Sequence, residues 1–217
     1  FNEVMNLRNY TKPLMIGSLS KFFYNKIYLN NEEITLFKKK RKTILFTFQP
    51  LVESESFCSN NLHHKIVFPT VLLNLILNSK SKYNFILRLH PIQIKNKDLL
   101  KFHMNAFSKL FSKCDNVDFI INNQKPLEYS LVNSDLHITF NSACLFDALD
   151  YNLKTILLDD DISRLNMFFG ELMNSDYVIV KPNLEIDFSE FFSQKIDKEA
   201  SSVFDFEDFI LKNMKSC

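Results

Sequence analysis

A histidine and an arginine stand at the end of one strongly apolar segment. Residues 84–91 read NFILRLHP, so an apolar run leads through Arg88 to His90 and Pro91. The run is long enough for a buried strand, and Pro91 cannot continue a strand ladder because proline has no N–H group to donate. A strand ending here would present Arg88 and His90 together at its carboxyl end, where they could clamp a phosphate group.

A second group of polar residues follows another apolar segment. Residues 136–140 are followed by Asn141 and Ser142, and then by a stretch with helical spacing that includes Asp147. Either Asn141 or Ser142 can cap such a helix. Free N–H groups and small hydroxyl side chains at a helix start favour anion binding, so this turn is a second candidate phosphate contact.

Each candidate also has an ordinary structural interpretation. His90 could cap a helix or fill the core, Ser142 could act only as a helix cap, and Arg88 could pair with an acid. The functional interpretation depends on their meeting in one crevice, so the elements that carry them matter.

Short apolar segments alternate with longer segments of helical spacing. Predicted strands cover residues 43–48, 84–90, 117–121, 136–140, 155–158 and 177–180, and predicted helices cover 62–80, 98–114, 126–132, 142–151 and 164–174, with two acidic, Phe-rich helices at the end. This alternation predicts an α/β fold, a Rossmann-like doubly wound parallel sheet flanked by helices. In such sheets ligands bind outside the carboxyl ends of the strands. The polar segments after the first four strands should therefore converge, including Asn122 in the segment 122–125.

Composition narrows the function classes. The 217 residues are 46% apolar and 24% charged with a net charge of +1, which fits a globular protein and gives no overall nucleic-acid footprint. The four cysteines are widely spaced and no Cys/His cluster has metal-site spacing, so we expect reduced thiols and no metal. No apolar stretch approaches the roughly 20 residues that span a bilayer. We therefore expect a cytoplasmic protein.

Glycine is unusually scarce. It occurs only twice, at Gly17 and Gly170, and no glycine-rich phosphate loop can be built from these two residues. Asparagine is the next residue that tolerates left-handed backbone, and we expect it to take over turn positions. The chain begins with Phe1 and not with Met, so we expect it to be a piece of a longer protein.

We divide the chain at its basic run. Residues 1–42 form a predicted lead-in and linker segment that ends in the run 38–42, KKKRK. This run is interpreted either as a solvated linker or as a peripheral contact with an anionic membrane surface, which would place the protein at the inner face of the membrane. Residues 43–217 form the predicted Rossmann-like domain with its C-terminal helices.

The order of these motifs resembles a known family. Arg88-Leu89-His90-Pro91 is followed by residues 134–142, SDLHITFNS, then by residues 146–149, FDAL, and residues 154–158, KTILL. This order resembles the C-terminal, donor-binding domain of glycosyltransferase-B enzymes. The families most like it are CDP-glycerol glycerophosphotransferases, bacterial sialyltransferases and capsule polysaccharide transferases. The resemblance covers roughly residues 13–180, because residues 16–18 also look like the segment that often leads into this domain.

The resemblance implies specific roles for these residues. His90 would be the catalytic phosphate contact that stabilises the departing nucleotide, with Arg88 beside it, while Ser142 and Asn141 would hold the same phosphate. Asp147 would face the ribose, although it could equally complement the helix dipole, and Asn122 would lie at the ribose or base. The chain departs from the family pattern because residues 141–143 keep only one hydroxyl of the usual pair.

The implied reaction is glycosyl transfer from a CMP-, CDP- or UDP-linked sugar to a glycan acceptor, in the synthesis of bacterial surface polysaccharide or lipooligosaccharide. Oriented N–H groups and a cationic histidine or arginine would stabilise the leaving phosphate without a metal or cofactor. We find no convincing general base, so an N-terminal acceptor-binding half or a partner chain would supply it. Two alternatives stay open: a transferase-like scaffold that has lost catalysis, and a UDP-sugar epimerase-like enzyme.

Overall fold

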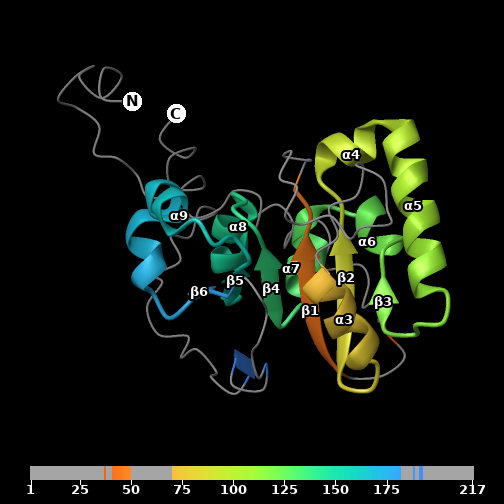
Figure 1. Ribbon diagram of the computed structural model, residues 1–217, viewed down its shortest axis with the longest axis horizontal. Helices are drawn as coiled ribbons and strands as arrows, with labels where there is room; N and C mark the ends of the chain where they lie inside the picture. Colours follow the sequence, from red (N-terminus) through yellow and green to blue (C-terminus); the bar gives the residue numbers. More distant parts are fainter. Residues whose placement is uncertain (1–36, 38–40, 50–69, 182–187, 189–190, 193–217) are drawn as a thin grey trace, which may run out of the picture.

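The fold is one sheet of six parallel strands with helices on both faces (Figure 1). The computed structural model describes residues 37, 41–49, 70–181, 188, 191 and 192. The strands are β1 (Lys42–Thr47), β2 (Tyr83–Arg88), β3 (Val117–Asp118), β4 (Leu136–Thr139), β5 (Thr155–Leu157) and β6 (Val178–Val180). They lie in the order β3-β2-β1-β4-β5-β6, so the predicted Rossmann-like doubly wound sheet is confirmed.

The helices lie in the crossovers between parallel strands, as right-handed βαβ winding requires. They are α3 (Thr70–Asn78), α4 (Pro91–Lys95), α5 (Lys97–Phe111), α6 (Ile121–Gln124), α7 (Leu127–Val132), α8 (Cys144–Asp150) and α9 (Ile162–Phe169), followed by the 3-10 helix η2 (Gly170–Asn174). α3 and α5 pack on one face of the sheet, while α7 and α8 pack on the other.

The alternation of side chains along a strand decides which residue meets which face. In β1, Ile44 and Phe46 join the core under α3 and α5, whereas Leu45 joins the core under α7 and α8. In β2, Phe85 and Leu87 likewise face α3 and α5. Because successive strand residues point to opposite faces, Thr47 and Arg88 point toward α7 and α8. Both faces of the central strands are therefore buried.

The third strand and the segment after it differ from the prediction. The apolar residues 117–121 predict a full strand, but β3 has only two residues and α6 begins at Ile121. The carboxylate of Asp118 explains the break, because it accepts hydrogen bonds from the backbone N–H groups of Ile120, Ile121 and Asn122. A side chain that satisfies the first amides of a turn competes with the strand ladder. The short helix α4 was also not predicted.

One turn supports the expected use of asparagine. Between α8 and β5, Asn152 has φ 55°, in the left-handed region, which asparagine tolerates better than most residues. The other positive φ among the described residues is Gly170, at 51°, where α9 gives way to η2.

Several expectations lie outside the described residues. They are the lead-in segment 1–36, the basic residues 38–40, the loop 50–61, the first part of the predicted helix 62–80, and most of the predicted C-terminal helices. The division of the chain at residue 42 therefore stays a prediction.

Candidate functional site at the carboxyl ends of β1, β2 and β4

The strand order places a topological switch point between β1 and β4. The chain winds outward from β1 through β2 to β3, then crosses back to place β4 on the other side of β1. All strands run in parallel, so their carboxyl ends meet at one edge (Figure 1). Ligands of doubly wound sheets bind in the crevice at this point. The predicted residues Arg88, His90, Asn141 and Ser142 all lie at this edge.

A pair of carboxamides bridges the switch point. The Nε2 group of Gln49, just beyond β1, donates to Oδ1 of Asn141, just beyond β4, at 2.7 Å. Both side chains are half-buried. Gln49 is missing from the residues predicted from the sequence, although its place as the first polar residue after a predicted strand could have signalled it.

Ser142 and Cys144 lie beside this pair at the start of α8. The Ser142 hydroxyl oxygen accepts from the backbone N–H of Cys144 at 3.3 Å. The N-cap position itself is Ala143, without a side-chain cap, so the expectation that Asn141 or Ser142 would be the N-cap is wrong by one or two residues. The side-chain oxygen of Asn141 does not cap α8, because it accepts the hydrogen bond from Gln49 instead.

A buried polar chain lies directly beneath the carboxamide pair. His137 of β4 contacts Thr47 Oγ1 through Nε2 at 2.9 Å and Thr155 Oγ1 through Nδ1 at 3.1 Å. Thr47 donates to Thr139 Oγ1 at 3.0 Å, and Thr139 donates to the Thr47 carbonyl at 3.2 Å. Since the Thr47 proton is used toward Thr139, Thr47 accepts from His137, whose proton is therefore on Nε2. Every named group in the chain is satisfied.

Burial keeps the imidazole of His137 neutral. The side chain is fully buried, and desolvation lowers its pKa to about 3. His137 was not singled out in the sequence. Its position between apolar residues of a strand was the available signal, because the register that sets Thr155 opposite it in β5 and Leu45 opposite it in β1 comes only from the structure. The network of hydrogen bonds through His137 fixes β1, β4 and β5 against one another just below the crevice.

His90 caps α4 through Nδ1, and its Nε2 has no hydrogen-bond partner among the described residues. Its backbone is extended, its Nδ1 accepts from the Ile92 N–H at 3.2 Å, and its own N–H donates to Gln93 Oε1 at 2.8 Å. An accepting Nδ1 requires the proton on Nε2. Partial burial lowers the His90 pKa. At neutral pH His90 therefore offers a neutral Nε2–H donor, and the expected cationic histidine is not what this geometry favours.

Arg88 is turned away from the expected phosphate position. Its guanidinium donates to the carbonyl oxygens of Asn122, Lys125 and Pro126 and to the Ser130 hydroxyl. These four acceptors, which belong to the segment 122–130 that includes α6 and α7, surround one partly buried guanidinium. Burial lowers the Arg88 pKa, and the neighbouring Cys144 and Glu128 oppose this. The geometry gives Arg88 the task of holding this segment against β2.

The two residues expected at the ribose or base have different surroundings. Asn122 is fully buried and its amide donates to Asp118, so its described contacts are internal. Asp147 is half-buried in α8, where burial, followed by the charges of Asp150 and Glu128, raises its pKa. Cys144 lies close enough to sense the charges of both Arg88 and Asp147. Asp147 therefore lies in the helix that follows the switch point, while Asn122 lies in α6, after the outer strand β3.

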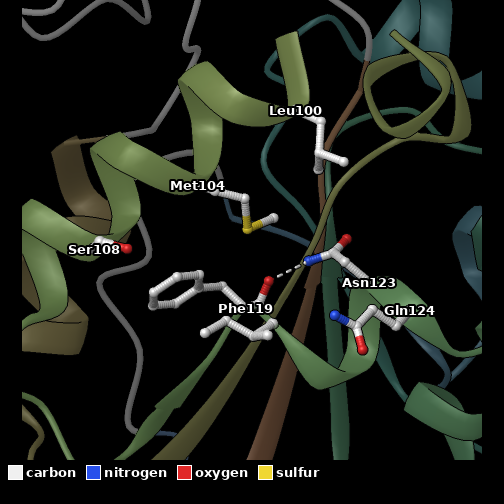
Figure 2. A pocket seen from close by; sticks show the side chains of 7 residues that line it. Leu100, Met104, Ser108, Phe119, Asn123 and Gln124 are labelled. Carbon is white, nitrogen blue, oxygen red and sulfur yellow. Dashed lines mark hydrogen bonds between the residues drawn. The ribbon is translucent and has the colours of Figure 1, made fainter. Parts of the chain in front are cut away.

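A separate hollow of about 270 Å³ opens beside β3, between α5 and α6 (Figure 2). Leu100 and Met104 of α5 face Phe119, Asn123 and Gln124 across it. Asn123 donates to the carbonyls of Leu87 and Phe119 and accepts from the Leu89 N–H, so its amide serves the end of β2. Apolar side chains make up most of its lining, alongside Ser108, Asn123 and Gln124.

Two features are absent from the described ranges, 41–49 and 70–181 with the few residues beyond. No group of three or more His, Cys, Asp or Glu side chains is placed to hold a metal ion. No helix in that part of the chain is long and apolar enough to cross a membrane.

Comparisons with known proteins give fold similarity at low identity. No protein-family model and no curated protein matches the sequence. The structure is similar to part of the wall teichoic acid polymerase TagF. One histidine variant matches with a TM-score of 0.44 and 17% identity over 76% of this chain and 36% of that chain. A second variant, soaked with CDPG, matches with a TM-score of 0.38 and 15% identity over 68% and 32% of the two chains.

A glycosyl transferase family 9 structure from Veillonella parvula matches with a TM-score of 0.41 and 12% identity, over 99% of this chain and 56% of that chain. This chain thus spans about a third of the TagF chains and about half of the family 9 chain. At similarities of this size, nothing about activity or substrate follows for this chain.

Proposed function

We propose that this chain is the donor-binding half of a glycosyltransferase that uses a nucleotide-activated sugar. The observation that carries the proposal is the gathering of uncharged hydrogen-bond donors at the switch point, with Gln49 and Asn141 bridged across β1 and β4 and Ser142 at the start of α8. His90 adds an Nε2–H at the end of β2. The motif order shared with donor-binding domains supports the same assignment.

The proposed chemistry is stabilisation of a leaving phosphate. As the bond from the sugar to the phosphate oxygen breaks, negative charge grows on that oxygen. Donors that are already in place at the crevice stabilise this charge without reorganising. His90 Nε2–H, the Ser142 hydroxyl and the Asn141 amide are the donors that we assign to the phosphate, with Asp147 at the ribose. The acceptor and the group that deprotonates it belong to a second half or a partner chain.

Pathway and location are part of the proposal. We assign the reaction to bacterial surface polysaccharide or lipooligosaccharide synthesis, with a CMP-, CDP- or UDP-linked donor and a glycan acceptor. The reaction would take place in the cytoplasm, and the basic run 38–42 would make a peripheral contact with the inner face of the membrane.

One observation favours a second candidate, a transferase-like scaffold without catalysis. The guanidinium of Arg88 is engaged by main-chain oxygens of the segment 122–126, so the cation expected beside His90 is committed to structure. A scaffold would keep the fold and the capping function of His90 but would not bind a nucleotide at the switch point.

The test is a thermal-shift titration of the full chain with CMP, CDP, UDP and GDP. Wild type is compared with His90→Asn, which keeps a capping side chain but lacks the Nε2–H, and with His90→Ala, which lacks both. A nucleotide at about 100 times its dissociation constant stabilises the fold by roughly 2.7 kcal/mol. We expect one nucleotide to stabilise wild type and both variants to lose most of that effect.

The two variants separate binding from folding. Without nucleotide, His90→Asn should unfold close to wild type, while His90→Ala should unfold earlier because α4 loses its cap. If no nucleotide stabilises wild type, the donor-binding proposal fails and the scaffold candidate is favoured. If nucleotide stabilises wild type and His90→Asn equally, His90 is only a cap.

A further inference from the structure

We propose that Gln49 is a further ligand-binding residue, which contacts a phosphoryl or sugar hydroxyl oxygen of the ligand that His90 and Asn141 hold. This inference rests on the proposed function and adds a contact that the motifs did not indicate. Its basis is the register of the three central strands.

Register places Gln49 between the two candidate residues. Thr47 of β1 lies opposite Arg88 of β2, and the pairing continues outward because the Phe48 N–H donates to the Arg88 carbonyl at 2.8 Å. Continued two residues past the strand ends, this register sets Gln49 opposite His90. On the other side, Phe46 lies opposite Ile138, so three residues further Gln49 lies opposite Asn141. The 2.7 Å bond between these two side chains agrees with this register.

Continued past the strand ends, the alternation of side chains also sets the three residues on one face of the sheet. Alternation along β2 and β1 sets His90 on the side of Arg88, and Gln49 on the side of Thr47. The same alternation sets Asn141 on the side of Thr139. Arg88, Thr47 and Thr139 form one row across the strands, and His90, Gln49 and Asn141 form the next row outward.

The spacing of the strands means that a ligand that contacts both His90 and Asn141 also lies close to Gln49. Neighbouring strands lie about 4.8 Å apart, so the backbones of His90 and Asn141 are roughly 10 Å apart with Gln49 between them. A ligand group that touches both side chains must pass across Gln49. If the assignments of His90 and Asn141 are correct, Gln49 therefore lies under the ligand.

The chemistry of the pair fits oxygen-rich ligands. The bond between Gln49 and Asn141 uses one N–H of Gln49 and the Asn141 oxygen. Within the described residues, the Asn141 amide nitrogen and the Gln49 oxygen have no hydrogen-bond partner. Two adjacent carboxamides with donors and an acceptor to spare suit phosphoryl and hydroxyl oxygens. The alternative is that Gln49 only holds Asn141 in position.

The experiment measures nucleotide affinity of the full chain by calorimetry, with CMP, CDP and UDP as probes. The variants are Gln49→Ala, Gln49→Glu, Asn141→Ala and the double alanine variant, with Asn74→Ala as the control because Asn74 is an exposed carboxamide in α3. Gln49→Ala should weaken binding about fivefold, the size of one neutral hydrogen bond. Gln49→Glu should weaken it more, because a carboxylate repels phosphate and has no N–H to donate. Asn74→Ala should bind as wild type.

The double variant separates contact from positioning. If Gln49 touches the ligand, the double variant should bind more weakly than Asn141→Ala. If the two bind equally, Gln49 acts only through Asn141 and the inference is overturned. It is also overturned, with the proposed function intact, if nucleotide binds wild type and Gln49→Ala equally well. If no probe binds wild type, the proposed function fails and this inference fails with it.

Discussion

His137 Nε2 and Thr47 Oγ1 lie 2.9 Å apart in the interior of the sheet, joining two strands whose residues are 90 positions apart in the sequence. The contact belongs to a chain in which each proton has one acceptor, running from Thr155 through His137 and Thr47 to Thr139. Such a buried chain holds only while the imidazole is neutral, because a second ring proton would meet the Thr155 hydroxyl, which already donates to Nδ1.

The first prediction is that stability falls in mild acid. The His137 pKa is about 3 in the folded chain and about 6.5 in an unfolded one. Between these values the unfolded state binds a proton that the folded state does not, so the unfolding free energy decreases as the pH falls. The slope from this residue is about 1.4 kcal/mol per pH unit. Urea denaturation between pH 7.5 and pH 4.5 measures it.

His137→Asn is the comparison that assigns this slope. Burial also lowers the pKa of His90 and of His103, so wild type carries contributions from several histidines. The variant should be less stable than wild type at pH 7.5, and its stability should depend less on pH. Equal slopes in both proteins would show that His137 does not set the acid response.

The second prediction concerns Arg88 as a structural residue. Arg88→Met removes the donors for the oxygens of residues 122, 125, 126 and 130. Leaving such oxygens unpaired costs about 2 kcal/mol, and Arg88→Lys should recover only part of it because lysine lacks the planar fork. Hydrogen exchange should quicken mainly in residues 120–130. Unchanged stability together with lost nucleotide affinity would restore Arg88 as a phosphate contact.

The third prediction uses Cys144 as a reporter of the crevice. Burial raises the pKa of this thiol, with a hydrogen bond from Ser142 and the charge of Arg88 acting in the opposite direction. Thiolate is therefore scarce at neutral pH, and alkylation by iodoacetamide should be slow and should quicken as the pH rises. A nucleotide bound at the switch point should slow it further. Cys114, which is also a free half-buried thiol, is the internal control in peptide mass spectrometry.

Ligand protection at Cys144 alone is the informative result. If nucleotide slows Cys144 and Cys114 alike, the ligand stabilises the whole fold without covering the crevice. If neither is slowed while thermal stabilisation is observed, the nucleotide binds elsewhere.

The fourth prediction concerns the turn between α8 and β5. Asn152 has φ 55°, a conformation that costs an ordinary L-residue roughly 1–2 kcal/mol. Asn152→Gly should leave the unfolding free energy close to that of wild type, while Asn152→Ala should lower it by about 1 kcal/mol. The pair is matched because both variants remove the same side-chain amide. Equal stability of the two would show that the left-handed turn is not required.

Much of the fold is visible in the sequence because its signals are local. The apolar run that ends at Arg88 predicts β2, the proline at 126 predicts the start of α7, and the spacing of Leu100, Phe107 and Phe111 predicts α5. The predicted length of β3 was too great, because the apolar residues of 117–121 gave no sign that Asp118 would turn the backbone into α6. A side chain that competes with the strand ladder acts through geometry and not through hydrophobicity.

For the candidate site, the sequence likewise predicted where the residues lie but not all of their contacts. The residues His90, Asn141 and Ser142 were predicted at the carboxyl edge and lie there, because any parallel sheet gathers its strand ends at one edge. Their ligand roles stay predictions. Arg88 lies at that edge but bonds to the segment 122–130, which no spacing rule could foresee.

The sequence by itself determined the alternation of strands and helices, and hence the edge at which polar residues gather, because burial patterns are encoded residue by residue. Only the tertiary structure decided the strand order and the register. These place Gln49 between His90 and Asn141 and turn the guanidinium of Arg88 toward the oxygens of a distant segment. The physical reason is that such contacts join residues about 30 to 90 positions apart, and they form only when the packed core has brought their strands together.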